Sequence, residues 1–127
     1  KYLDADNSKR RELARIYEMG LSDKGYVLPE ARPDTSHVYH LYVIASRGRD
    51  TLLKALSEKG ISAGVHYRVP AHLHEGYNSR CRLPIGGLPV TEKLVGNIVS
   101  LPMYPELSIK DTEKVISAIK GLGNILQ

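Results

Sequence analysis

The chain has 127 residues, of which 42% are hydrophobic and 25% charged, and its formal net charge is +4. No apolar run approaches the roughly 20 residues of a membrane-spanning helix, so a membrane span is excluded. The basic residues are spread along the chain and all aromatic residues are tyrosines, whereas a nucleic-acid-binding domain would have a denser basic stripe with interleaved aromatic residues. We expect neither a membrane nor a nucleic acid as a partner. A basic pocket for a phosphorylated small ligand explains the charge about as well, and a basic nucleic-acid-binding domain stays a third alternative because charge alone decides little. The length predicts one domain, which would bury roughly two-thirds of its unfolded surface.

The ends of the chain and its one cysteine bear on its origin. The first residue is Lys1, and neither an initiator methionine nor a signal peptide is present, so we expect the sequence to lie inside a longer protein. Cys81 has no partner for an internal disulfide, which suits the cytoplasm. Arg80 and Arg82 flank it and could make it reactive, although an ordinary loop cysteine is the simpler interpretation.

The first predicted element is a helix over residues 7–19. Asn7 or Ser8 can cap its start, and Gly20 is its expected stop. Its apolar positions recur at helical spacing and are Leu13, Ile16 and Tyr17. Residues 23–35 contain prolines and a glycine and are predicted to be an irregular linker.

The middle of the chain shows the pattern strand, helix, strand. Residues 37–45 are the strongest strand signal, and their nearly continuous apolar character predicts that both faces are covered. Residues 49–59 form a predicted amphipathic helix that Gly60 ends. Residues 61–67 are predicted to be a second strand.

The C-terminal third alternates loops with short elements. Residues 76–87 have turn-forming residues without periodicity, and Pro89 is suited to the first turn of a short helix. Residues 98–101 read as a short apolar strand. Ser108 is expected to cap the last helix, with Asp111 three residues on as in a capping box. The buried stripe of that helix is predicted to be Val115, Ile116, Ile119 and Leu122. Together the elements predict an α+β fold, a small sandwich of about three strands backed by about three helices.

Residues 62–74 hold the densest set of chemically capable side chains, namely His66, Tyr67, Arg68, His72 and His74. Imidazoles could bind zinc, but Glu75 is the only carboxylate nearby and no cysteine completes a ligand set. The same side chains are hydrogen-bond donors suited to a phosphate or a hydroxyl-rich ligand. A third interpretation leaves His66 and Tyr67 partly buried in the sheet and the other histidines in water. The residues alone leave these interpretations open.

Catalysis by this chain alone has no motif to support it. The sequence has no nucleophile elbow, phosphate-binding loop, dinucleotide fingerprint or zinc-protease motif. His40, within the first predicted strand, is expected to be an interior histidine. Tyr104 is either a packing residue or a wall of the same pocket as the histidine stretch.

Five motifs resemble the C-terminal part of the DegT/DnrJ/StrS family of sugar aminotransferases, which have the aspartate aminotransferase fold (fold type I). The motifs follow one another in the family's order and cover nearly the whole chain. They are His-Val-Tyr-His-Leu-Tyr-Val-Ile from His37, Leu-Lys-Ala-Leu-Ser-Glu-Lys-Gly-Ile-Ser-Ala-Gly-Val-His-Tyr ending at Tyr67, Pro-Ala-His-Leu-His from Pro70, Leu-Pro-Val-Thr-Glu-Lys-Leu from Leu88, and Ser-Leu-Pro-Met-Tyr-Pro-Glu-Leu from Ser100.

The resemblance implies a pyridoxal-phosphate enzyme that moves an amino group, usually from glutamate, onto a nucleotide-linked keto sugar, generally as a homodimer. It implies that residues 1–20 are an interdomain helix and residues 21–127 the small C-terminal domain, with mostly antiparallel strands. The large domain that carries the Schiff-base lysine is absent from this sequence. No lysine here sits in the family's lysine motif, so we expect this chain alone to hold no cofactor and to be inactive.

By motif match, the resemblance implies that His66, Tyr67 and His72 line the substrate side of the cleft and position the sugar or its phosphates. It assigns no catalytic, cofactor-binding or metal-binding residue to this chain. The alternative is a freestanding α+β ligand-binding or regulatory module without catalysis. Without a large domain, apolar side chains of the first helix such as Leu13, Ile16 or Tyr17 would be exposed, so we expect self-association through them or marginal solubility.

Overall fold

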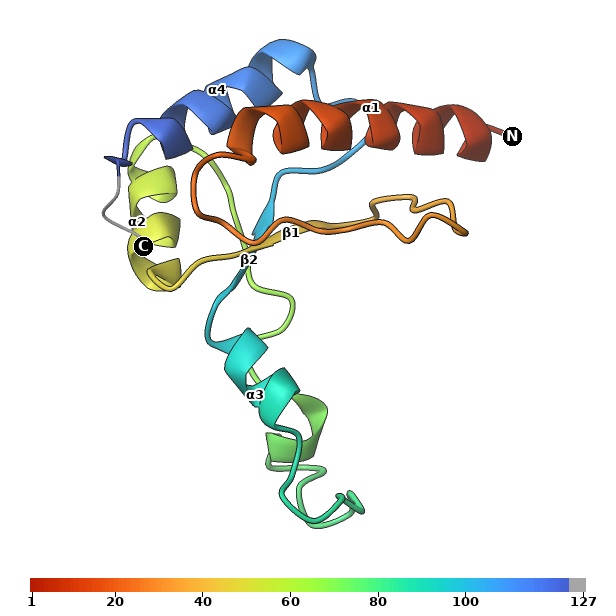
Figure 1. Ribbon diagram of the computed structural model, residues 1–127, viewed down its shortest axis with the longest axis vertical. Coiled ribbons are helices and arrows are strands. Elements are labelled where there is room, and N and C mark those ends of the chain that lie inside the picture. The colour runs from red at the N-terminus through yellow and green to blue at the C-terminus, as the bar shows by residue number, and fades with distance from the viewer. Residues whose placement is uncertain (124–127) are drawn as a thin grey trace.

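The computed structural model describes residues 1–123. Over that range the chain forms four α-helices, one 3-10 helix and two strands. They are α1 (Leu3–Leu21), β1 (Tyr42–Ala45), α2 (Arg49–Glu58), η1 (Ala71–Leu73), α3 (Pro89–Val95), β2 (Ile98–Leu101) and α4 (Ile109–Lys120). Helices α1, α2 and α4 and the two strands form a body, with α1 and α4 above the strands and α2 to their left in Figure 1, and residues 65–97, here called the arm, project from it. No helix in the described part of the chain is both long and apolar enough to cross a membrane.

The sheet has one antiparallel pair of strands, β1 with β2, in which Tyr42 lies opposite Leu101. Isolated bridges add one residue at each edge, and these pairs are Val27–Ala45 and Gly64–Ser100. The α+β class is confirmed, but the predicted third strand over residues 61–67 is reduced to the single bridge at Gly64. Small residues at positions 62–64 offer little side-chain surface to bury, so nothing extends the ladder there. The helices within residues 1–123 number four, one more than the predicted set of about three.

The first predicted strand is shorter than its apolar run. Residues 37–41 lie outside β1, and Tyr39 has a φ of 49°, in the left-handed region that interrupts an extended chain. His40 is exposed, so the prediction of an interior histidine is wrong. The carbonyls of Tyr39, His40 and Met103 accept hydrogen bonds from the Arg10 guanidinium at 3.3, 3.1 and 3.1 Å. Arg10 therefore ties α1 to the segment before β1 and to the segment after β2.

Helix α1 is longer than predicted at both ends. It has no side-chain cap, and Asp4 and Asp6 lie in its first turn, where carboxylates interact favourably with the positive end of the helix dipole. Gly20 lies inside the helix and does not end it. A Cβ at this position would be 2.7 Å from Cδ1 and 2.8 Å from Cγ2 of Ile116 on α4. The glycine therefore allows two helices to approach closely.

The other helix termini follow the sequence signals. Ser108 caps α4, because its Oγ accepts a hydrogen bond from the Asp111 amide at 3.0 Å and donates to Asp111 Oδ2 at 2.6 Å. Pro89 occupies the first turn of α3. Helix α2 ends one residue earlier than predicted, and Gly60 beyond it has a φ of 71°, which suits a glycine after a helix end.

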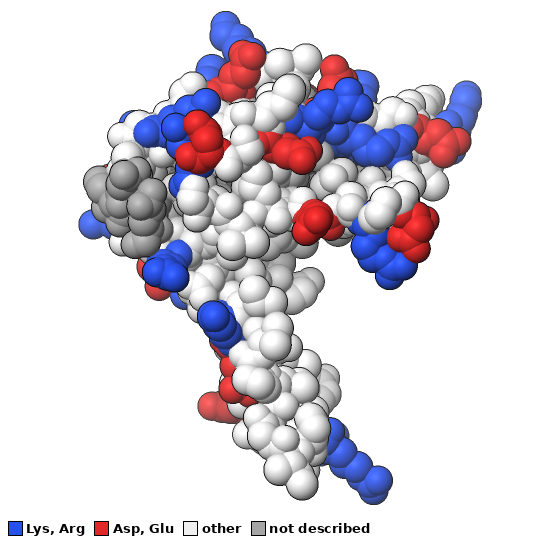
Figure 2. All heavy atoms as spheres, viewed as in Figure 1, with Lys and Arg blue, Asp and Glu red and all other residues white. Residues whose placement is uncertain are grey.

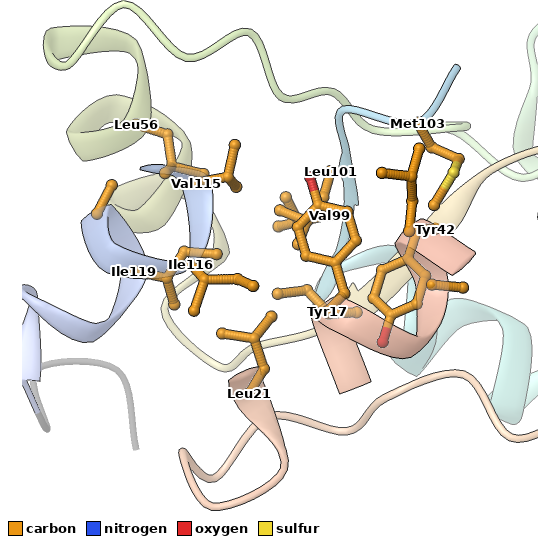
Figure 3. Packing of buried hydrophobic residues seen from close by; sticks show 14 of the residues in the cluster. Tyr17, Leu21, Tyr42, Leu56, Val99, Leu101, Met103, Val115, Ile116 and Ile119 are labelled. Carbon is orange, nitrogen blue, oxygen red and sulfur yellow. The ribbon is translucent and has the colours of Figure 1, made fainter. Parts of the chain in front are cut away.

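The core lies between the strands and the three body helices (Figure 3), and α4 packs against both α1 and α2. At its centre the rings of Tyr17 and Tyr42 stack with centroids 4.8 Å apart. The Tyr17 hydroxyl donates to the Pro102 carbonyl at 2.9 Å. The Tyr42 hydroxyl is buried and has no hydrogen-bond partner among the described residues. Burial raises the pKa of both phenols.

The expected exposed patch on the first helix is absent. Leu13 is 3% exposed and Tyr17 is fully buried, while Ile16 is partly buried against the core, because α4 covers this face. The arm instead carries exposed apolar side chains, and these are Tyr67, Val69, Leu73, Tyr77, Leu83, Ile85, Val90 and Leu94. In Figure 2 most of the arm is uncharged, whereas charges of both signs cover the body.

Candidate functional site

A turn at the edge of the sheet positions His66. Nδ1 of His66 shares a hydrogen bond of 2.9 Å with Oγ of Ser100, a buried residue of β2. Gly64 makes room for the imidazole, because a Cβ there would lie 3.2 Å from His66 Cε1. The bond orients the ring and leaves Nε2 as the nitrogen that a ligand could contact.

Tyr67 follows directly and faces solvent. Tyr67 is 76% exposed, and its ring meets the His66 ring edge-on with centroids 5.7 Å apart. Arg68 Nη1 lies 3.9 Å from Asp50 Oδ1 on α2, an exposed ion pair that stabilises little. His66 and Tyr67 together present an imidazole nitrogen and a phenol hydroxyl to a polar ligand.

His72 occupies a different environment, inside the arm. It lies on η1, is 6% exposed, and its Nε2 is 3.1 Å from Oε1 of Glu92 on α3. The same carboxylate oxygen accepts a hydrogen bond from the Leu88 amide at 3.3 Å. The His72 contact, and then the Leu88 amide, lower the pKa of Glu92. This pair fastens η1 to α3.

The structure thus brings His66 and Tyr67 together and engages His72 with Glu92. His74 is exposed, with its ring centroid 6.1 Å from that of Tyr77. Tyr104 borders a groove between the end of α2 and α4 and not the turn at His66. Within residues 1–123 no three histidine, cysteine or acidic side chains come together in a group that could hold a metal ion.

Two partners of the candidate residues were missed from the sequence. Ser100 interrupts the otherwise apolar run of β2, and a polar residue inside a buried strand is a signal that could have identified it. Glu92 has no comparable signal, because it is 20 residues from His72 in the sequence and resembles any exposed helix carboxylate.

The cofactor implied by the resemblance needs a lysine within a cleft and a cradle for its phosphate. Every lysine of the described chain is exposed, and Lys93 is the one that lies on α3. None lies next to the His66–Tyr67 turn in the sequence. The described residues therefore do not supply a Schiff-base lysine at the His66–Tyr67 turn, and no chemical step through pyridoxal phosphate is assigned to them.

The chain is similar in sequence to a known protein family and to individual members of it. The profile of the DegT/DnrJ/EryC1/StrS aminotransferase family matches residues 1–120. The chain is 37% identical over 122 residues to an erythromycin biosynthesis sensory transduction protein, EryC1, of Saccharopolyspora erythraea, covering 95% of this chain and 33% of that protein. It is 32% identical over 122 residues to a dTDP-3-amino-3,6-dideoxy-alpha-D-galactopyranose transaminase of Aneurinibacillus thermoaerophilus, covering 96% of this chain and 33% of the relative.

Solved structures give the same result. DesV of S. venezuelae, in complex with a ketimine intermediate, superposes with a TM-score of 0.89 at 36% identity, covering 95% of this chain and 33% of that one. A DegT DnrJ EryC1 StrS aminotransferase from Brucella abortus gives a TM-score of 0.88 at 36% identity, covering 95% and 32% of the two chains. The chain spans about a third of the length of these relatives. It belongs to the DegT/DnrJ/EryC1/StrS aminotransferase family.

Proposed function

We propose that this chain is the C-terminal small domain of a pyridoxal-phosphate-dependent aminotransferase that acts on nucleotide-linked keto sugars, and that it is inactive alone. The observation that carries the proposal is the superposition on DesV over 95% of the chain with a TM-score of 0.89. Two relatives matched over most of the chain bear the names of dTDP-amino-sugar transaminases. Residues 1–20 would join this domain to the larger part of the enzyme, and residues 21–127 would be the small domain.

In this proposal the two parts of the enzyme have separate tasks. Pyridoxal phosphate, when bound, supplies the electron sink for amino-group transfer, and residues outside this chain hold it. The present residues bind and orient the sugar nucleotide. Glutamate would be the amino donor, and the whole enzyme would be a homodimer.

The His66–Tyr67 turn is the proposed substrate-facing surface. Nδ1 of His66 is engaged with Ser100, so Nε2 can hydrogen-bond to a sugar hydroxyl or a phosphate oxygen. The exposed Tyr67 hydroxyl can do the same from the adjacent position. In this proposal His72 also lines the substrate side of the active-site cleft. Its bond to Glu92 holds η1 against α3 at the edge of that cleft.

The first test is the open reading frame upstream of the codon for Lys1. A large domain with a cofactor-binding lysine there supports the proposal, whereas a start codon next to Lys1 contradicts it. The second test is amino transfer from glutamate to a dTDP-linked keto sugar, followed by mass spectrometry. We expect product from the complete polypeptide with pyridoxal phosphate and none from residues 1–127 alone.

The third test addresses the turn. In the complete enzyme, Tyr67→Phe and His66→Ala should each raise KM about 3–10-fold with a smaller effect on kcat, because each removes a hydrogen bond used in binding and not in proton transfer. Tyr77→Phe, an exposed phenol elsewhere in the arm, is the matched control and should leave both constants unchanged. Equal KM values for all three variants and the parent enzyme would refute the assignment.

A further inference from the structure

A cleft of about 600 Å³ lies where the arm meets the body. One wall is the end of β1 with the adjoining Val27, and the other is α3. The residues that matter here are Val27, Ser46, Arg47, Val90, Lys93 and Leu94. None of His66, Tyr67 and His72 lines it, so it is distinct from the proposed substrate-facing turn. Its volume is within the range of roughly 300–1,000 Å³ typical of small-molecule sites.

The cleft presents an apolar surface. Val27, Val90 and Leu94 are 70%, 71% and 47% exposed, and they come from two segments, the bridge beside β1 and helix α3. Helix α3 buries none of its residues. Clustered apolar side chains left open at a concave surface favour a ligand with an apolar body.

The charged residues at the cleft are cationic only. Arg47 and Lys93 line it, no aspartate or glutamate does, and neither cation has a carboxylate within 4.0 Å in the part of the chain that the structure describes. Other basic residues such as Arg32, Arg49 and Lys114 are paired. Two uncompensated cations beside an apolar surface attract an anion.

Ser46 adds a polar group at the wall of the cleft. It is 4% exposed, and its amide donates to the Asn97 carbonyl at 2.9 Å. Its hydroxyl has no hydrogen-bond partner among residues 1–123. A buried hydroxyl without a partner is unfavourable.

We propose that this cleft binds a small amphipathic anion, with an aromatic or aliphatic body against Val27, Val90 and Leu94 and a phosphate or carboxylate between Arg47 and Lys93. The proposal does not depend on the chain being part of an aminotransferase. An inorganic anion would lack the apolar contacts, and a neutral apolar molecule would lack the ionic ones.

The test uses 1-naphthyl phosphate as the ligand, with 1-naphthol and inorganic phosphate for comparison, in calorimetric and amide chemical-shift titrations of the protein at low salt. We expect 1-naphthyl phosphate to bind at least about tenfold more tightly than either comparison compound, because only it makes both kinds of contact. The largest shifts should fall in residues 45–47 and 90–97. Shifts centred on residues 66–72, or spread evenly over the arm, would overturn the proposal.

The variants separate specific from general electrostatic binding. The double variant Arg47→Gln/Lys93→Gln should weaken binding about tenfold or more. The control Lys9→Gln/Arg15→Gln removes the same charge from the exposed face of α1 and should change affinity less than about twofold. Val90→Glu places a carboxylate in the first turn of α3, where the helix tolerates it, and should abolish binding of 1-naphthyl phosphate. Equal losses of affinity for 1-naphthyl phosphate in the two double variants would contradict a specific anion site in this cleft. Retained binding in Val90→Glu would contradict it as well.

Discussion

At the scale of single residues, two stacked tyrosines in the core have opposite hydrogen-bonding states. The Tyr17 hydroxyl donates to the Pro102 carbonyl, whereas the Tyr42 hydroxyl has no partner within the described chain. Both rings fill the same core and are almost completely inaccessible to water. The pair therefore allows the value of one buried hydrogen bond to be compared with the cost of one buried unpaired hydroxyl.

We expect Tyr17→Phe to lower the free energy of unfolding by about 1 kcal/mol, because it leaves the Pro102 carbonyl without its donor. Tyr42→Phe should leave the free energy of unfolding unchanged or raise it by up to about 1 kcal/mol, since it removes only an unsatisfied group. Urea denaturation of both variants measures the difference. Equal losses of unfolding free energy in Tyr17→Phe and Tyr42→Phe would show that the Tyr42 hydroxyl has a hydrogen-bond partner in solution.

The Glu92 carboxylate predicts a pH dependence of the arm. The bond to His72 lowers the pKa of Glu92 below its ordinary value of 4.5. The contribution of the Glu92 carboxylate to the stability of the arm is therefore fully present above pH 4.5 and is lost as the pH falls through the lowered pKa. In Glu92→Gln this contribution is missing at every pH. The opening free energy of the arm, from hydrogen exchange of the Leu88 amide, should therefore be lower in the variant at about pH 5.5, and the difference from the parent should shrink as the pH falls through the lowered pKa of Glu92. Glu75→Gln, the control in the same arm, should behave as the parent at every pH, and a pH-independent effect of Glu92→Gln would contradict the prediction.

At the scale of elements, the contact between α1 and α4 depends on one missing methyl group. Gly20 costs helix stability, by roughly 1 kcal/mol relative to alanine, yet it lies within α1 where Ile116 packs against it. Close packing of the two helices outweighs helix propensity at this position. A glycine that looks like a helix stop in the sequence is thus a packing residue.

Gly20→Ala should lower the free energy of unfolding by about 1–3 kcal/mol despite the gain in helix propensity, because Ile116 or α4 must move. Ile116→Ala in the same chain should remove this penalty, so the double-mutant cycle should give a coupling free energy of about 1 kcal/mol or more. Gly96→Ala is the control, since a Cβ there would have its nearest neighbour, the Lys93 carbonyl, at 3.6 Å. Chemical denaturation of the parent, the two single variants, the double variant and the Gly96→Ala control is the measurement. Additive losses of unfolding free energy in the double variant would show that Gly20 and Ile116 are not coupled.

At the scale of the whole molecule, the body and the arm differ in how much they bury. The body holds the whole apolar cluster of α1, α2, α4 and the two strands. In the arm, residues 65–97, His72 is the one buried residue. Local stability follows buried apolar contacts, so the arm should open without the body.

Native-state hydrogen exchange should show this difference. Amides of the body, such as that of Leu52 bonded to Gly48, should exchange only through global unfolding, whereas amides of the arm, such as that of Tyr77 bonded to His74, should exchange at least about 100-fold faster. Low urea should accelerate the body amides and leave the arm amides nearly unchanged. A common opening free energy for both groups would mean that the arm and body form one cooperative unit.

The sequence by itself determined the elements whose signals are local. The Ser108 cap of α4, Pro89 at the start of α3, the glycine after α2 and the apolar strand at residues 98–101 are all set by neighbours within a few residues, and each was predicted. The family resemblance and the choice of His66 and Tyr67 as adjacent polar residues also rested on short motifs. Local hydrogen bonding and side-chain periodicity suffice for such features.

Only the tertiary structure decided which distant groups meet. The run at residues 37–45 became a four-residue strand because pairing with β2 stops there, and residues 61–67 kept a single bridge. Gly20 faces Ile116, Ser100 orients His66, and Glu92 engages His72, and each of these contacts joins residues far apart in sequence. Burial and hydrogen-bond satisfaction depend on the whole packed chain, so no local pattern of residues could specify them.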